Sequence, residues 1–191
     1  PCARFATSLV AKRAHGAVAA ALGNVAHEVP QKLRTLRGVH HFEMELGGVE
    51  PTFLVGDVRE EARLLVERTH EATMRGINAV APGRALNVVG RVIESYARRF
   101  GYRVVRDFTG HGIGTAMHME PHILNFGQAG QGPALEVGMA LAIEPMVNAG
   151  RPEAKVLKDK WTAVAKDGSY SAHFEHCAAI TQGEPWVLTR P

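Results

Sequence analysis

The stretch Gly110-His111-Gly112-Ile113-Gly114 is the first of four short motifs that carry histidine or glutamate in the last third of the sequence. The other three are His118-Met119-Glu120-Pro121, Ile143-Glu144-Pro145 and Phe174-Glu175-His176. Carboxylate oxygens and neutral imidazole nitrogens together suit Mn, Fe, Co, Ni or Zn. Glycines flank His111, which lets the backbone pass close to whatever the imidazole binds. The four motifs therefore indicate a candidate site for divalent metal.

Two of the glutamates lie next to apolar, strand-like sequence. Leu141-Ala142-Ile143 precedes Glu144, and Cys177-Ala178-Ala179-Ile180 follows Glu175. A buried carboxylate is unfavourable unless it is paired, protonated or bound to a cation. A lone histidine such as His118 is more often structural than functional, but four such motifs in one segment favour a site.

The composition fits one compact domain. The chain has 191 residues, of which 46% are hydrophobic, enough for one sizeable core. Its 22 basic and 19 acidic residues form no long run of one sign, so nucleic-acid binding gains little support. Cys2 and Cys177 lack Cys-x-x-Cys spacing, which fits a reducing cytoplasm. No apolar run approaches the roughly 20 residues of a membrane-spanning helix, and the Ala-rich stretch from Ala14 to Leu22 is too short and too broken by polar neighbours to predict a signal peptide.

Two amphipathic helices are predicted in the middle of the chain. Asp57 is a candidate N-cap with Glu60 three residues later, and an apolar face then continues to about Ala72. This helix should end before Pro82-Gly83. Apolar residues recur at intervals of three and four over residues 86–100, which predicts a second helix. Both are interpreted as packing helices without a chemical role.

Short segments that favour β-structure follow the helices and are separated by turn residues. These segments are Arg103–Phe108, Met139–Ile143, Val156–Leu157, Thr162–Ala165, His173–Thr181 and Trp186–Leu188. Near the start of the chain, Phe42, Met44 and Leu46 alternate with polar residues as in a half-buried strand. Helices followed by strands predict an α+β class, with the helices on one face of a mainly antiparallel sheet.

The motifs, together with Trp161 and the segment Ser171–Thr181, resemble the C-terminal signature of type I methionine aminopeptidases. The resemblance extends from about Thr52 to Thr189, with several separate motifs in the family's order and spacing. It implies the pita-bread fold shared with creatinase-like and prolidase-like proteins. The expectation is one metallopeptidase-like domain over residues 1–191, with a divergent and incomplete first lobe over 1–50 and the catalytic part over 51–191.

The resemblance also implies residue roles. His111 resembles the sole histidine ligand, Glu144 a glutamate ligand of the same metal, and Glu175 the glutamate that bridges both ions. His118 resembles the second histidine, which hydrogen-bonds the substrate near the scissile amide and stabilises the developing charge. Glu144 is assigned a catalytic role as well, because a glutamate of such a site shuttles the proton of the attacking water.

Met117 and Trp161 match family positions near the pocket for the substrate's first side chain, where soft apolar surface favours a methionine thioether. The implied reaction is removal of the N-terminal methionine from nascent peptides. The implied cofactors are divalent ions of Co, Mn, Fe, Ni or Zn, two in the family, with one or none as alternatives here. Implied partners are peptides and nascent chains that begin with methionine, and the ribosome is a candidate. A monomer without membrane or nucleic-acid partners is expected.

The upstream motifs depart from the family pattern. Met44-Glu45-Leu46-Gly47 resembles the first aspartate motif, with Glu45 as a metal ligand in place of aspartate. Thr52-Phe53 resembles the closing pair, but the segment between the two is too short to hold the second aspartate. His27-Glu28-Val29-Pro30 is similar to the family's His-Gly-Ile-Pro, whose histidine helps position substrate, so His27 is a candidate catalytic residue.

Three accounts of this departure stay open. A frameshift in a degenerate gene would scramble the region up to about Pro51. A genuine variant would keep one metal through Glu45, Glu144, Glu175 and His111 and lose the second ion. A catalytically impaired pita-bread module would instead present its cleft to peptides or proteins, since a binding module can lose the aspartate pair and a dinuclear peptidase cannot.

The other histidines are assigned no role. His40 and His41 are adjacent strand-like residues that point to opposite faces, so they cannot easily share one ion. His122 and His173 border the motifs, so they would either support the site residues or be exposed, and exposure is the expectation.

Overall fold

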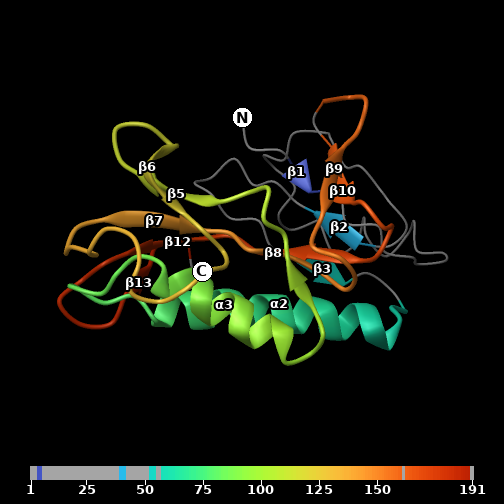
Figure 1. Cartoon of the computed structure of the whole chain (residues 1–191), viewed down its shortest axis with the longest axis horizontal. Helices are drawn as coiled ribbons and strands as arrows, with labels where there is room; N and C mark the ends of the chain where they lie inside the picture. The colour runs from blue at the N-terminus through green and yellow to red at the C-terminus, as the bar shows by residue number, and fades with distance from the viewer. Residues whose placement is uncertain (1–3, 6–38, 42–51, 55–56, 161, 190–191) are drawn as a thin grey trace, which may run out of the picture.

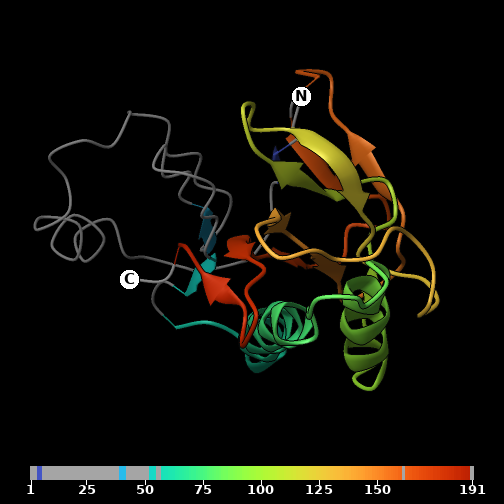
Figure 2. The same cartoon turned by 90° about the vertical axis from the view of Figure 1, so that its left-hand side faces the viewer.

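The computed structural model describes residues 4–5, 39–41, 52–54, 57–160 and 162–189. Within this part of the chain, two helices lie on one side of a set of short strands (Figure 1). The view turned by 90° shows the helices next to each other beneath the strands (Figure 2). This arrangement confirms the α+β class. The strand predicted around residues 42–46 and the candidate residues His27, Glu45 and Trp161 lie outside the described residues.

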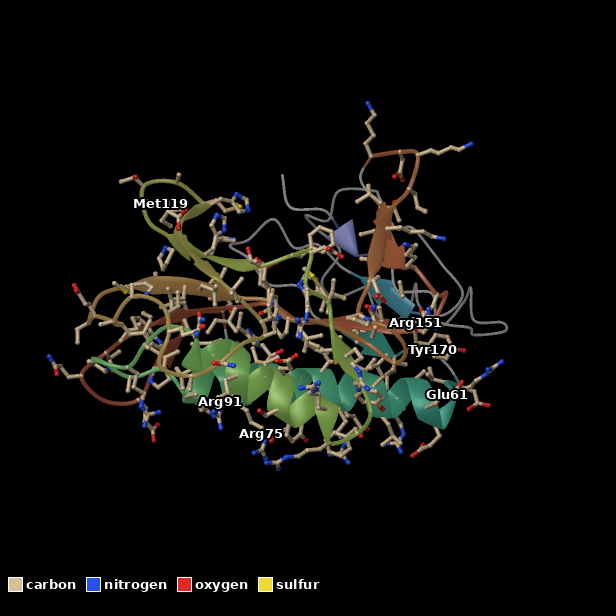
Figure 3. All side chains as sticks on the ribbon, viewed as in Figure 1. Glu61, Arg75, Arg91, Met119, Arg151 and Tyr170 are labelled. Atoms are coloured by element: carbon tan, nitrogen blue, oxygen red, sulfur yellow. The ribbon has the colours of Figure 1, made fainter. Side chains whose placement is uncertain are left out.

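Helix α2 spans Glu60–Asn78 and helix α3 spans Val88–Arg98, close to the predicted ranges. The predicted cap was wrong, because the N-cap of α2 is Arg59 and no side chain caps the helix. Instead, two glutamates lie in the first turn, where the helix dipole favours negative charge. Arg75 and Arg91 project on the side away from the strands (Figure 3). Neither of these two helices combines the length and the hydropathy needed to cross a membrane.

The described strands form four groups, and every pairing except β1 with β10 is antiparallel. The five-stranded sheet has the order β13 (Trp186–Val187), β12 (His176–Ala179), β7 (Ala140–Ile143), β5 (Gly110–Ile113), β6 (Met119–Ile123). One three-stranded sheet has the order β11 (Ser171–His173), β8 (Met146–Asn148), β4 (Arg103–Val104). The other is β1 (Arg4–Phe5), β10 (Thr162–Ala165), β9 (Ala154–Val156), and the last pair is β2 (Val39–His41) with β3 (Thr52–Leu54).

The strand predictions were confirmed where apolar residues dominate, as at β7 and β10. The single segment predicted from His173 to Thr181 is in fact the end of β11 followed by β12, and these strands belong to different sheets. Strands β5 and β6 were not predicted. Their glycines and proline lower β propensity, so only the pairing of β5 with β7 and of β6 with β5 reveals them.

The main core lies between the helices and the strands β7, β8, β11 and β12. Alternate side chains of these strands point toward the helices and join one apolar cluster with residues of α2 and α3. The strand members of this cluster include Leu141, Ile143, Val147, Ala172 and Ala178, with Phe174 between β11 and β12. The positions between them face the opposite side, where the candidate metal site lies.

We predict that Gly90→Ala destabilises the fold. A methyl group at this position of α3 would overlap the backbone carbonyl oxygen of Leu124, and backbone cannot give way as a flexible side chain can. The overlap outweighs the better helix propensity of alanine, so we expect a loss of about 1–3 kcal/mol in the free energy of unfolding, measured with urea. Gly183→Ala is the control, since its added methyl meets nothing within 4 Å. Equal stability of Gly90→Ala and the wild type would refute this packing.

We also predict a pH-dependent effect of Asp167→Asn. The Asp167 carboxylate accepts hydrogen bonds from the backbone N–H groups of Arg151 (2.7 Å) and Ser169 (3.0 Å). These bonds lower the pKa of Asp167 to about 2. The lowered pKa means that the ionised group stabilises the folded chain above about pH 4, and that this contribution disappears as the pH falls through about 2. Because the group is exposed, we expect a difference of about 1 kcal/mol or less. Urea unfolding of the wild type and of Asp167→Asn from pH 6 to pH 2 measures this difference in the free energy of unfolding. A difference that does not change with pH would contradict the stabilising role of the ionised carboxylate.

Candidate metal centre

The candidate site lies where the chain passes from one sheet to the next. Glu144 lies between β7 and β8, and Glu175 lies between β11 and β12. Ile143 pairs with His176, and Met146 pairs with His173. The same antiparallel register, continued across the junction, sets Glu144 opposite Glu175. Directly opposite residues of an antiparallel pair have Cβ atoms about 4.5–5.5 Å apart, so the two glutamates lie side by side.

Successive side chains along these strands point alternately to the two faces of this junction. Leu141 and Ile143 pack toward the helices, so Ala142 and Glu144 point the other way. On the partner strands, the odd-numbered residues from His173 to Cys177 share the face of Glu144. The candidate metal ligands therefore lie on the face of the sheets opposite α2 and α3.

Strand β5 brings His111 to the same face. His111 pairs with Ala142, two residues before Glu144 on the same face of the strand, and its Nε2 lies 3.6 Å from Glu144 Oε1. Both residues are buried, with relative exposures of 7% and 4%. His111 Nδ1 lies 3.0 Å from the carbonyl oxygen of Gly112, which can only accept, so Nδ1 donates and Nε2 is the nitrogen that faces the carboxylate. A cation placed between Nε2 and the carboxylate oxygen would bind both donors.

The glycines around His111 allow β5 to lie close to both neighbouring strands. A methyl group at Gly110 would overlap the carbonyl oxygen of Ala142 on β7, and one at Gly112 would overlap the carbonyl oxygen of Glu120 on β6. The sequence interpretation placed this close approach at a ligand. The structure places it between strands, so that β5 can pair on both sides while carrying His111.

His118 reaches the site from the loop between β5 and β6. Its ring centroid lies 4.3 Å from that of His111, with the rings inclined at 55°. Partial desolvation lowers the pKa of His118, and the neighbouring His111 lowers it further. Met117 is 64% exposed, and Met119 lies on the same hairpin (Figure 3). The neutral His118 imidazole is thus an accessible group at the rim of a buried cluster.

His173 was expected to be exposed, and this prediction was wrong. Its relative exposure is 3%, and its Nε2 lies 3.8 Å from Glu144 Oε2. The backbone carbonyl of His173 accepts a 2.7 Å hydrogen bond from Thr52 Oγ1. The residue is buried because β11 pairs with β8, a relation that the sequence around it does not reveal. The expected exposure of His122 was confirmed, with 70% of its side chain accessible.

The pKa of the buried Cys177 thiol reflects the negative charges of the candidate site. Burial raises the pKa of its thiol to about 11, and the charges of Glu175 and Glu144 contribute to the rise. The sulfur therefore stays protonated at neutral pH. The charges of both carboxylates reach this one buried thiol. Like charges placed opposite each other in a sheet are destabilising unless a cation offsets them.

The donor chemistry of this cluster fits a divalent cation. Within the described ranges, no three His, Cys, Asp or Glu side chains are grouped closely enough to enclose an ion. The observed pair of His111 and Glu144 nevertheless combines an imidazole lone pair with a buried carboxylate, and Glu175 adds a second negative charge. Borderline ions such as Co, Ni and Zn accept both donor types.

Comparison with known proteins gives the family. The chain matches the model of metallopeptidase family M24 over residues 46–182. It is 51% identical to methionine aminopeptidase 2 of Mycobacterium tuberculosis over 152 residues, which cover 80% of this chain and 51% of the relative. It is 39% identical to the methionine aminopeptidase of Clostridium acetobutylicum over 173 residues, covering 86% and 69%. The chain thus spans about half the length of the M. tuberculosis relative.

Comparison with solved structures leads to the same family. The crystal structure of methionine aminopeptidase from Rickettsia prowazekii matches with a TM-score of 0.73 and 40% identity, over 80% of this chain and 60% of that one. The prolidase from Pyrococcus furiosus shares the fold, with a TM-score of 0.58. These matches confirm the resemblance noted in the sequence. The chain is a member of metallopeptidase family M24 and has the pita-bread fold that it shares with methionine aminopeptidases.

Proposed function

We propose that this chain removes the N-terminal methionine from peptides in a metal-dependent reaction. The observation that carries the proposal is the pair of buried Glu144 and half-buried Glu175, set side by side, with Nε2 of the buried His111 facing the carboxylate of Glu144. The names of the M. tuberculosis and C. acetobutylicum relatives support the choice of substrate. Nascent chains in the cytoplasm would be the natural substrates.

His111, Glu144 and Glu175 would hold the cation, with Glu45 as a further proposed ligand. A bound divalent ion supplies a water of lowered pKa and polarises a peptide carbonyl. Glu144 is buried, and its carboxylate would accept a proton from the attacking water and pass it to the leaving amine.

His118 would act on the substrate directly. Because its pKa is lowered, the ring is neutral near pH 7 and can donate a hydrogen bond to the scissile carbonyl as negative charge develops on the oxygen. The accessible Met117 would line the pocket for the methionine side chain together with Trp161, and His27 would help to position the peptide.

We predict that the purified chain, loaded with Mn or Co, releases free methionine from a Met-Ala-Ser peptide, and that Glu175→Gln abolishes this activity. Glutamine keeps the shape of glutamate and removes its charge, so we expect the rate to fall by at least about 100-fold and the bound metal to fall by one equivalent or more. Methionine release and metal content after dialysis measure the two effects. Glu136→Gln, on an exposed turn, is the matched control.

A folded wild-type chain that binds neither ion and cleaves no peptide would contradict the proposal. If that chain still binds a methionine-terminated peptide in isothermal titration, the result would favour the alternative of a catalytically impaired peptide-binding module. Equal activity of Glu175→Gln and the wild type would remove Glu175 from the site.

A second substitution separates catalysis from metal binding. We predict that His118→Gln lowers kcat by about 100- to 1,000-fold, the usual effect of losing one donor to a developing oxyanion, and leaves the metal content unchanged. Steady-state kinetics and metal analysis on the same sample measure both quantities. His122→Gln is the control, because His122 is exposed on the neighbouring strand. Loss of metal from His118→Gln would make His118 a ligand and overturn its assigned role.

A further inference from the structure

We propose that a pocket between α2 and α3 binds a small phosphate-bearing dianion. The pocket has a volume of about 200 Å³ and combines three arginines with a hydroxyl group and an aromatic ring. It is lined by Arg75, Arg91, Val92, Ser95, Tyr96 and Arg99. Arg75 and Arg91 project on the side of the molecule away from the strands (Figure 3). The candidate metal ligands lie on the opposite face of the sheets, so this pocket is a separate site.

The sequence of α3 explains why its polar groups line one pocket. Arg91, Ser95 and Arg99 follow one another at intervals of four residues, which places them along the same side of the helix. Arg75 lies in the last turn of α2. The helices approach closely at the next residue, Gly76, because a methyl group there would overlap a side chain of α3. This close approach brings a guanidinium from α2 to the arginines of α3.

The guanidinium of Arg75 is held in place before any ligand arrives. Its Cζ lies 4.6 Å from the ring centroid of Tyr96, and its Nε donates a 2.7 Å hydrogen bond to Glu71 Oε1. Tyr96 is itself buried, and its hydroxyl oxygen accepts a 3.4 Å hydrogen bond from Arg68 Nη1. The bond to Glu71 uses Nε, so the two terminal nitrogens of Arg75 can donate to a ligand. A guanidinium fixed in this way loses little conformational entropy on binding.

The charge of the pocket matches a dianion. Within the part of the chain that the structure describes, Arg91 and Arg99 form no ion pair, and Glu71 offsets the charge of Arg75. Glu94 of α3 does not line the pocket, and its Oε1 accepts a 3.0 Å hydrogen bond from an arginine that follows the helix. Three guanidinium groups and one carboxylate leave two positive charges. A phosphate monoester carries about 1.5 to 2 negative charges near pH 7.

The donor types and the size of the pocket select the ligand class. Guanidinium groups bind phosphate oxygens through two parallel hydrogen bonds, and the Ser95 hydroxyl adds another donor. Pockets for drug-sized ligands have volumes of about 300–1,000 Å³, so this smaller pocket suits a phosphate group rather than a whole cofactor. Because Ser95 and the arginines are exposed, the organic part of a monoester would extend into solvent. Inorganic phosphate and a nucleotide monophosphate both present this chemistry.

Isothermal titration of the full chain with inorganic phosphate and with AMP, in about 0.1 M salt, tests the proposal. We expect Arg91→Gln and Arg99→Gln each to weaken phosphate binding by about 10-fold or more, because each loses a charge-assisted contact. Arg98→Gln is the matched control, since Arg98 is exposed on the same helix, has the same charge and does not line the pocket. It should change the affinity by less than about threefold, because salt screens the more distant charge. Circular dichroism checks that each variant folds.

Tighter binding of AMP than of inorganic phosphate would assign the site to a monoester, and equal or weaker binding would assign it to the free anion. Either result supports the proposal, provided that adenosine, which lacks the phosphate, does not bind. A wild type that binds neither phosphate nor AMP would overturn it. An equal loss of affinity in Arg98→Gln and Arg99→Gln would also overturn it, since the attraction would then be diffuse. Methionine release and metal content do not enter this test, so its failure leaves the proposed function untouched.

Discussion

The pairing of Glu144 with Glu175 at a buried sheet junction is the constraint on which the site depends. Removing a carboxylate from water costs several kcal/mol, and a second carboxylate opposite it adds repulsion. Ring nitrogens lie at both oxygens of Glu144, and the nearby Cys177 thiol stays protonated. A cation at this point would offset both the burial and the repulsion, so we infer that metal binding and the stability of the junction are coupled.

The rest of the fold makes such a polar junction tolerable. Every second residue of β7, β8, β11 and β12 packs toward the two helices, so one face of these strands supplies the apolar core. The other face is then available for charged and polar groups without interrupting the core. The close packing of β5 against β6 and β7, which requires Gly110 and Gly112, carries His111 to that polar face. The candidate metal ligands and the core residues therefore occupy alternate positions of the same strands.

The sequence predicts the parts of this arrangement that depend on local pattern. Amphipathic periodicity located α2 and α3, and acidic residues next to apolar segments singled out Glu144 and Glu175. The sequence does not predict the features that depend on pairing between distant segments. The burial of His173 follows from β8 on one side and from Thr52, 121 residues away, on the other. A helix cap at Asp57 had a sound local motif, but the chain places Arg59 at that position.

The charge of the described part of the site bears on how many ions it suits. Glu144 and Glu175, when ionised, would together balance one divalent cation, whereas a neutral His111 would add a donor without adding charge. A second divalent ion at the same junction would bring two further positive charges and would need more carboxylate. Glu45 is the candidate to supply it, and it lies outside the described residues. The two described carboxylates would therefore balance the charge of one divalent ion, and the imidazole of His111 would add a nitrogen donor of the kind that Co, Ni and Zn accept.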